Sequence, residues 1–106
     1  MTEGKKKPLV LIRTDGNNLI GMGHIFRTIG IAEKLKSKGF DICYLIPEDE
    51  IIIDKIKSFG KYYVTNNNEI NELTLIKKIQ PEIFILDILK KYFKFSKNYF
   101  KIIKKV

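Results

Sequence analysis

Four short apolar runs, each bounded by turn residues, alternate along the chain with segments of helical periodicity. The runs cover residues 8–14, 40–46, 61–65 and 82–87, and the helical segments cover residues 23–38, 49–59 and 69–79. Continuous apolar runs are typical of strands buried on both faces of a parallel sheet, whose crossovers are helices. Since such crossovers are right-handed, the pattern predicts an α/β, Rossmann-like open parallel sheet of order 3-2-1-4 with helices on both faces.

The length of 106 residues allows one domain. We expect a flexible basic N-terminus over residues 1–7 and a Rossmann-like domain over residues 8–106. A last amphipathic helix is predicted for residues 96–106, and a fifth strand would normally follow it. The domain is therefore expected to be one half of a two-domain architecture, incomplete without a C-terminal partner domain or partner chain. Self-association is a further possibility.

The net charge of +8 comes from the ends of the sequence. Residues 88–106 hold seven lysines and no acid, whereas residues 9–87 hold ten basic and eleven acidic residues. This distribution argues against a nucleic-acid partner. Cys43 is the only cysteine, which excludes a disulfide framework and indicates a buried, inert thiol. No signal peptide or membrane-length apolar run is evident, so we expect a cytoplasmic protein without membrane contact.

The segment 13–27, between the first predicted strand and the first predicted helix, is the densest group of polar and glycine residues. Free N–H groups at such a strand-to-helix turn attract anionic or polar ligands. Gly21 and Gly23 supply the start of a dinucleotide fingerprint, but Phe26 replaces its third glycine. A P-loop needs lysine where Met22 stands. We therefore expect no cofactor, and a single histidine and cysteine far apart predict no metal site.

His24 is expected in the first helical turn, at the mouth of this crevice. The positive end of a helix disfavours a protonated imidazole, so a neutral ring would be available to accept a proton. That setting suits a general base near neutral pH. A capping or core-edge histidine is the structural alternative.

The pattern Arg13-x-Asp15-Gly16-x4-Gly21-x-Gly23-His24-x2-Arg27 resembles the N-terminal motif of the UDP-sugar hydrolases of pseudaminic acid biosynthesis and the related spore-coat polysaccharide proteins. That resemblance implies a glycosyltransferase-B architecture, with two Rossmann-like domains facing a cleft. It also implies release of UDP from a UDP-linked diacetamido-trideoxy sugar, as water attacks the anomeric carbon. Transfer of the sugar to an acceptor and a non-catalytic binding or assembly module remain as alternatives.

The resemblance implies a role for each matching residue. His24 would be the catalytic base, and Gly21 and Gly23 would form the loop that approaches the sugar. The remaining substrate-binding candidates are Arg13, Asp15, Gly16, Arg27 and Asp87. Arg13 and Asp15 would order the loop or contact substrate, and for Arg27 a salt bridge that orders the loop is favoured. Asp87, at the end of the fourth predicted strand, would contact the sugar or cap a helix.

Overall fold

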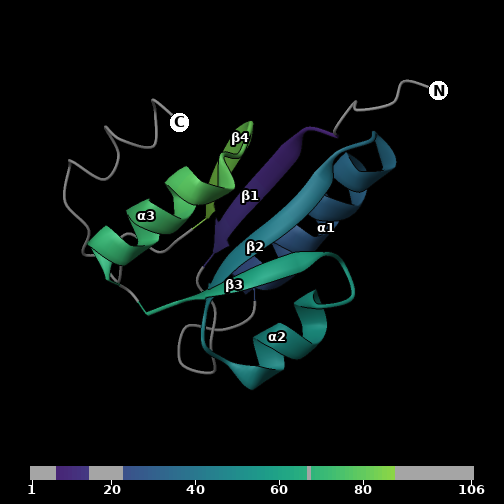
Figure 1. The fold of residues 1–106 in the computed structure, drawn as a ribbon. Helices are drawn as coiled ribbons and strands as arrows, with labels where there is room; N and C mark the ends of the chain where they lie inside the picture. The colour runs from purple at the N-terminus through teal and green to yellow at the C-terminus, as the bar shows by residue number, and fades with distance from the viewer. Residues whose placement is uncertain (1–6, 15–22, 67, 88–106) are drawn as a thin grey trace.

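The computed structural model describes residues 7–14, 23–66 and 68–87, with the backbone alone described for Gly23 and His24, and shows a four-stranded parallel sheet (Figure 1). The strands are β1 (Leu9–Thr14), β2 (Asp41–Pro47), β3 (Lys61–Thr65) and β4 (Ile83–Asp87). The helices are α1 (Gly23–Ser37), α2 (Glu50–Ile56) and α3 (Glu69–Ile79). The strand order is β3-β2-β1-β4, and all neighbouring strands are parallel. The predicted α/β fold class and strand order are confirmed.

Local capping explains where the second and third helices begin. The Asp49 carboxylate accepts hydrogen bonds from the backbone N–H groups of Ile51 and Ile52, so α2 starts at Glu50. The helix then ends at Ile56, three residues earlier than its sequence pattern predicts. Asn68 caps α3 in the same way, by accepting from the N–H of Asn71 at 3.0 Å. The helix predicted for residues 96–106 lies outside the described residues.

The two faces of the sheet carry separate hydrophobic cores. Helices α1 and α2 cover one face, and α3 covers the other (Figure 1). Alternate residues of β1 serve the two cores: Val10 and Ile12 pack on the α1 side, and Leu11 packs on the α3 side. This alternation follows from the two-residue repeat of a strand, and it explains why β1 is apolar at successive positions.

The carboxyl ends of β1 and β4 meet at the point where the order of the strands reverses. The chain moves from β1 through β2 to β3 on one side of β1, and then crosses to β4 on the other side. In open α/β sheets, ligands bind at such a switch point. Thr14 of β1 is in register with Asp87 of β4, and alternation along β1 places both on the α1 side.

Within the ranges that the structure describes, no helix is both long and apolar enough to cross a membrane.

Candidate functional site

The switch point brings together several residues that the sequence analysis singled out. The backbone of Gly23 and His24 forms the first turn of α1, and Arg27 follows in the same helix. Asp87 ends β4, beside the end of β1. The predicted site residues Asp15, Gly16 and Gly21 lie outside the described residues.

Arg27 and Asp87 form an ion pair that joins α1 to β4. The Arg27 guanidinium donates through Nη2 to Oδ1 of Asp87 at 2.8 Å and through Nε to Oδ2 at 3.3 Å. The hydrogen bond and charge of this carboxylate raise the pKa of Arg27. Arg27 thus forms a salt bridge, with Asp87 as its partner, while the expected ordering of the loop stays a prediction. It holds the beginning of α1 over the end of β4, while contact of either residue with a substrate stays a prediction.

Thr14 ends β1 and is the register partner of Asp87 in β4. Its side chain is fully buried, and its hydroxyl finds no hydrogen-bond partner in the part of the chain that the structure describes. A buried hydroxyl without a partner is costly, by about 1–3 kcal/mol, and is rare in folded proteins. Among the described residues, the end of β1 therefore holds a buried hydroxyl without a partner on the face that carries α1.

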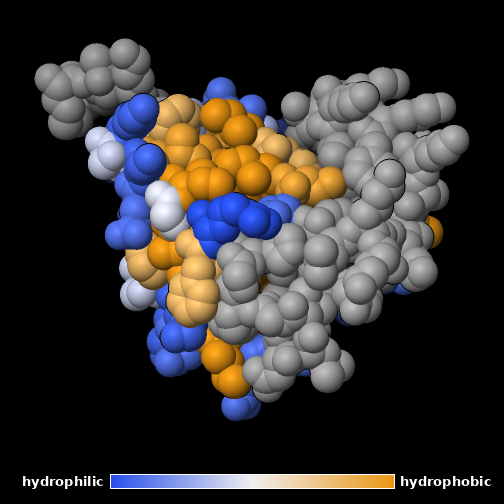
Figure 2. Space-filling view, turned by 180° about the vertical axis from the view of Figure 1, so that it is seen from behind, coloured by the Kyte–Doolittle hydropathy of each residue, from blue (hydrophilic) through white to orange (hydrophobic). Residues whose placement is uncertain are grey.

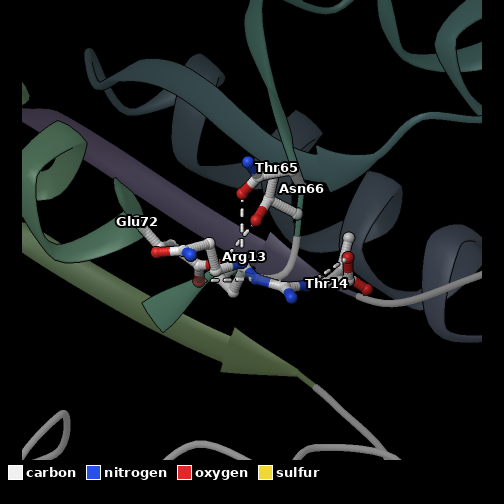
Figure 3. Close-up of polar contacts among 6 residues, drawn as sticks. Arg13, Thr14, Thr65, Asn66 and Glu72 are labelled. Carbon is white, nitrogen blue, oxygen red and sulfur yellow. Dashed lines mark hydrogen bonds and ion pairs between the residues drawn. The ribbon is translucent and has the colours of Figure 1, made fainter. Parts of the chain in front are cut away.

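Arg13 belongs to a different cluster, on the α3 face of the sheet (Figure 3). Its Nε donates to Oε1 of Glu72 at 2.8 Å, and both side chains are fully buried. The hydroxyl of Thr65, the last residue of β3, donates to the other oxygen of Glu72 at 2.6 Å. Arg13 alternates with Thr14 along β1, so its side chain points away from α1. The Arg13 side chain therefore lies on the opposite face of the sheet from Arg27.

The Arg13 side chain also contacts the backbone at the end of its own strand. Its Nη1 donates to the carbonyl oxygen of Thr14 at 3.1 Å (Figure 3). This carbonyl is the last one before the glycine-containing segment 15–22. Both roles expected for Arg13, ordering of the loop and contact with substrate, stay predictions.

Glu72 and Thr65 are the polar residues that the sequence analysis did not single out. Glu72 immediately precedes Leu73 in α3 and lies four residues before Ile76, and both of these apolar residues face the sheet. A carboxylate within the apolar face of a helix needs a buried cation, and Arg13 interrupts an apolar strand. That combination is the signal from which the pair could have been found.

No cluster of three or more His, Cys, Asp or Glu side chains that could hold a metal ion is found in residues 7–14, 23–66 and 68–87.

Comparison with known proteins gives one relative and no family. The chain is 35% identical over 100 residues to an uncharacterized protein of Methanocaldococcus jannaschii, MJ1062. The match covers 92% of this chain but 20% of the relative, so the chain spans about a fifth of the length of that protein. No profile of a known protein family matches the chain, and no solved structure gives a significant match.

Proposed function

We propose that this chain is the N-terminal, His24-bearing half of a nucleotide-sugar hydrolase. The observation that carries the proposal is the position of α1, which begins at Gly23 at the switch point and is tied to β4 by the Arg27–Asp87 ion pair. The resemblance of residues 13–27 to the UDP-sugar hydrolases supports the same assignment. The substrate is a UDP-linked diacetamido-trideoxy sugar, and the products are the free sugar and UDP.

In the proposed reaction, His24 takes a proton from a water molecule as the water oxygen attacks the anomeric carbon. The bond between this carbon and the phosphate oxygen breaks, and its electron pair leaves with UDP. The proton on His24 then passes to solvent, which restores the neutral imidazole. Each step needs only water and the nucleotide sugar.

The surroundings of α1 favour a substrate with phosphate and hydroxyl groups. The first N–H groups of a helix have no partner within the helix, and they carry the positive end of its dipole. Because Arg27 already neutralises Asp87, this carboxylate repels an anionic substrate less than a lone acid would.

The test measures UDP release from the UDP-linked diacetamido sugar by the chain supplied with a C-terminal nucleotide-binding domain, in cis or in trans. We expect His24→Ala to lower the rate by about 100- to 10,000-fold, the range for loss of a general base. Lys36→Ala, an exposed change in the last turn of the same helix, should leave the rate unchanged. Circular dichroism checks that both variants are folded. An unaltered rate in His24→Ala would overturn the assignment.

A second experiment tests substrate binding by the chain alone. In an NMR titration with the same UDP-sugar, backbone amide shifts should cluster at Thr14, Arg27 and Asp87. Turnover should be slow or absent, because the partner domain supplies half of the transition-state contacts. If no shifts appear at these residues, the switch point is not the substrate site.

A partner-binding module is the second candidate, and it is favoured by apolar surface on the α1 face. Figure 2 shows apolar side chains gathered on that face around a hydrophilic patch. Ile31 of α1 is 37% exposed, and Ile83, whose register partner Val10 packs on the α1 side, is 40% exposed. Size-exclusion chromatography tests self-association through this surface. An associating protein whose Ile83→Ser variant is monomeric, and which gives no shifts with UDP-sugar, would favour the second candidate.

A further inference from the structure

A cavity of about 530 Å³ lies on the opposite face of the sheet from α1, between α3 and the carboxyl ends of β2 and β3. Its lining consists of Leu45, Glu48, Val64, Thr65, Asn66, Asn71, Glu72, Thr74, Leu75 and Lys78. The volume falls within the range of small-molecule sites, roughly 300–1,000 Å³. It lies at the carboxyl edge of the sheet, at the ends of β2 and β3 and away from the switch point between β1 and β4.

The inner wall of this cavity holds two polar groups that the fold keeps fixed. Thr65 is 6% exposed and Glu72 is 2% exposed, and the two are joined by a 2.6 Å hydrogen bond (Figure 3). Arg13 neutralises Glu72 from beneath. The wall is therefore polar and carries no net charge, and its geometry is set by contacts made before any ligand arrives.

The rim carries polar side chains that form no hydrogen bond or ion pair with the described part of the chain. The Glu48 carboxylate, the Asn71 side-chain amide and the Lys78 ammonium have no hydrogen-bond or ion-pair partner among residues 7–14, 23–66 and 68–87. Asn71 and Lys78 lie seven residues apart on α3, close to two full turns, so they line the same side of the helix. These groups can bond to a ligand without breaking an existing contact.

The charges around the cavity sum to zero. Glu48 is balanced by Lys78, and Glu72 is balanced by Arg13. A charged ligand would find no net opposite charge there, and burying it would be costly. Two leucines on the α3 side of the sheet, Leu45 and Leu75, add an apolar part to the lining. The chemistry thus suits an uncharged ligand with both hydrogen-bonding groups and an apolar surface.

We propose that this cavity binds a neutral sugar ring. A hexose offers an apolar C–H face to the aliphatic side chains, and its hydroxyl groups both donate and accept hydrogen bonds. Carboxylates accept from hydroxyls, while amides do both, so Glu48 and Asn71 match a ring with neighbouring hydroxyls. The site is separate from the α1 face, and the inference does not depend on the hydrolase assignment.

The experiment is an NMR titration of the chain with glucose, galactose, mannose and N-acetylglucosamine in turn. We expect backbone shifts at Thr65, Asn66, Asn71 and Leu75 with at least one of them, and a Kd on the order of 1–10 mM for so small a ligand. The same ring carrying a charge is the comparison: glucosamine and glucose 6-phosphate should bind no more tightly than the neutral sugar. Because the ligand is uncharged, its affinity should not change between about 50 and about 500 mM salt.

The Asn71→Ala variant tests the assigned site. Loss of a neutral hydrogen bond should weaken the binding of the responding sugar about fivefold. Lys77→Ala is the matched control, because Lys77 is exposed on the same helix and does not line the cavity. Three results would each overturn the proposal: no shifts in the cavity with any neutral sugar, tighter binding of a charged sugar, or equal binding by Asn71→Ala and the unmodified chain.

Discussion

Removal of the Glu72 carboxylate by Glu72→Ala should destabilise the fold more than any loss of a surface charge. Glu72 satisfies two buried groups at once, the Arg13 guanidinium and the Thr65 hydroxyl. In the Ala variant, the Arg13 charge stays buried with its main counter-charge gone. Breaking one partner of a buried ion pair costs about 3–5 kcal/mol. A domain of this size has a total stability of only about 5–15 kcal/mol, so a large share of it would be lost.

Urea unfolding followed by circular dichroism measures the effect. We expect a lower midpoint with an unchanged slope, the signature of a stability change without a change in the exposed area. Asp54→Ala is the control, since Asp54 pairs with Lys57 on the surface at 2.9 Å, and we expect no measurable change there. The double variant Arg13→Met with Glu72→Leu removes both charges and should recover most of the loss. If Glu72→Ala lowered the urea midpoint no more than Asp54→Ala, the Arg13–Glu72 pair would not stabilise the fold as argued.

Two further predictions follow from the backbone and from one buried thiol. Gly30 lies on an open helix surface, so Gly30→Ala should stabilise the protein by about 0.5–1 kcal/mol. Gly60→Ala should destabilise it by about 1–3 kcal/mol, because the added Cβ would lie 2.5 Å from the carbonyl oxygen of Ile42. The urea midpoint of unfolding measures both changes. Burial raises the pKa of Cys43 from 9.0 to about 11, so the thiol of the unfolded chain ionises first. The free energy of unfolding should therefore fall by about 2 kcal/mol as pH rises from 9 to 11. Burial also raises the pKa of Tyr44, which lowers stability at high pH in the same way. A Cys43→Ala variant should therefore still lose part of its stability as the pH rises. A free energy of unfolding that does not change across this pH range would contradict the argument.

The elements and their order could be predicted because they depend on local patterns. The apolar runs fixed the strands to within about a residue, since turn residues bound each of them. Right-handed crossovers then left few orders for four strands, and 3-2-1-4 was among them. The end of α2 was less predictable, because Ile56 and the residues after it lack a strong stop signal before Gly60.

The candidate site was harder to predict, because β1 is apolar on both faces. Nothing in such a run shows which residues face α1, so the sequence did not reveal that Arg13 and Arg27 lie on opposite faces of the sheet. The structure separates them, and it pairs Arg13 with Glu72, 59 residues away. The Arg27–Asp87 pair joins residues 60 positions apart, and it depends in the same way on the pairing of β4 with β1. Such long-range pairings depend on how the strands are aligned with one another, and the local pattern of apolar and polar residues does not contain that information.

The central place of β1 has a consequence for the order in which the chain can assemble during synthesis. A ribosome releases β1, β2 and β3 well before β4, whose Ile83 must return to pair with Val10 near the start. Contacts of such long separation are slow to form, because closing a long loop costs entropy first. Until α3 docks, the Arg13 guanidinium lacks the Glu72 carboxylate, and its charge keeps the α3 face of the nascent sheet hydrated. The Arg13 charge, which is paired with Glu72 in the folded protein, would thus disfavour aggregation of the incomplete sheet.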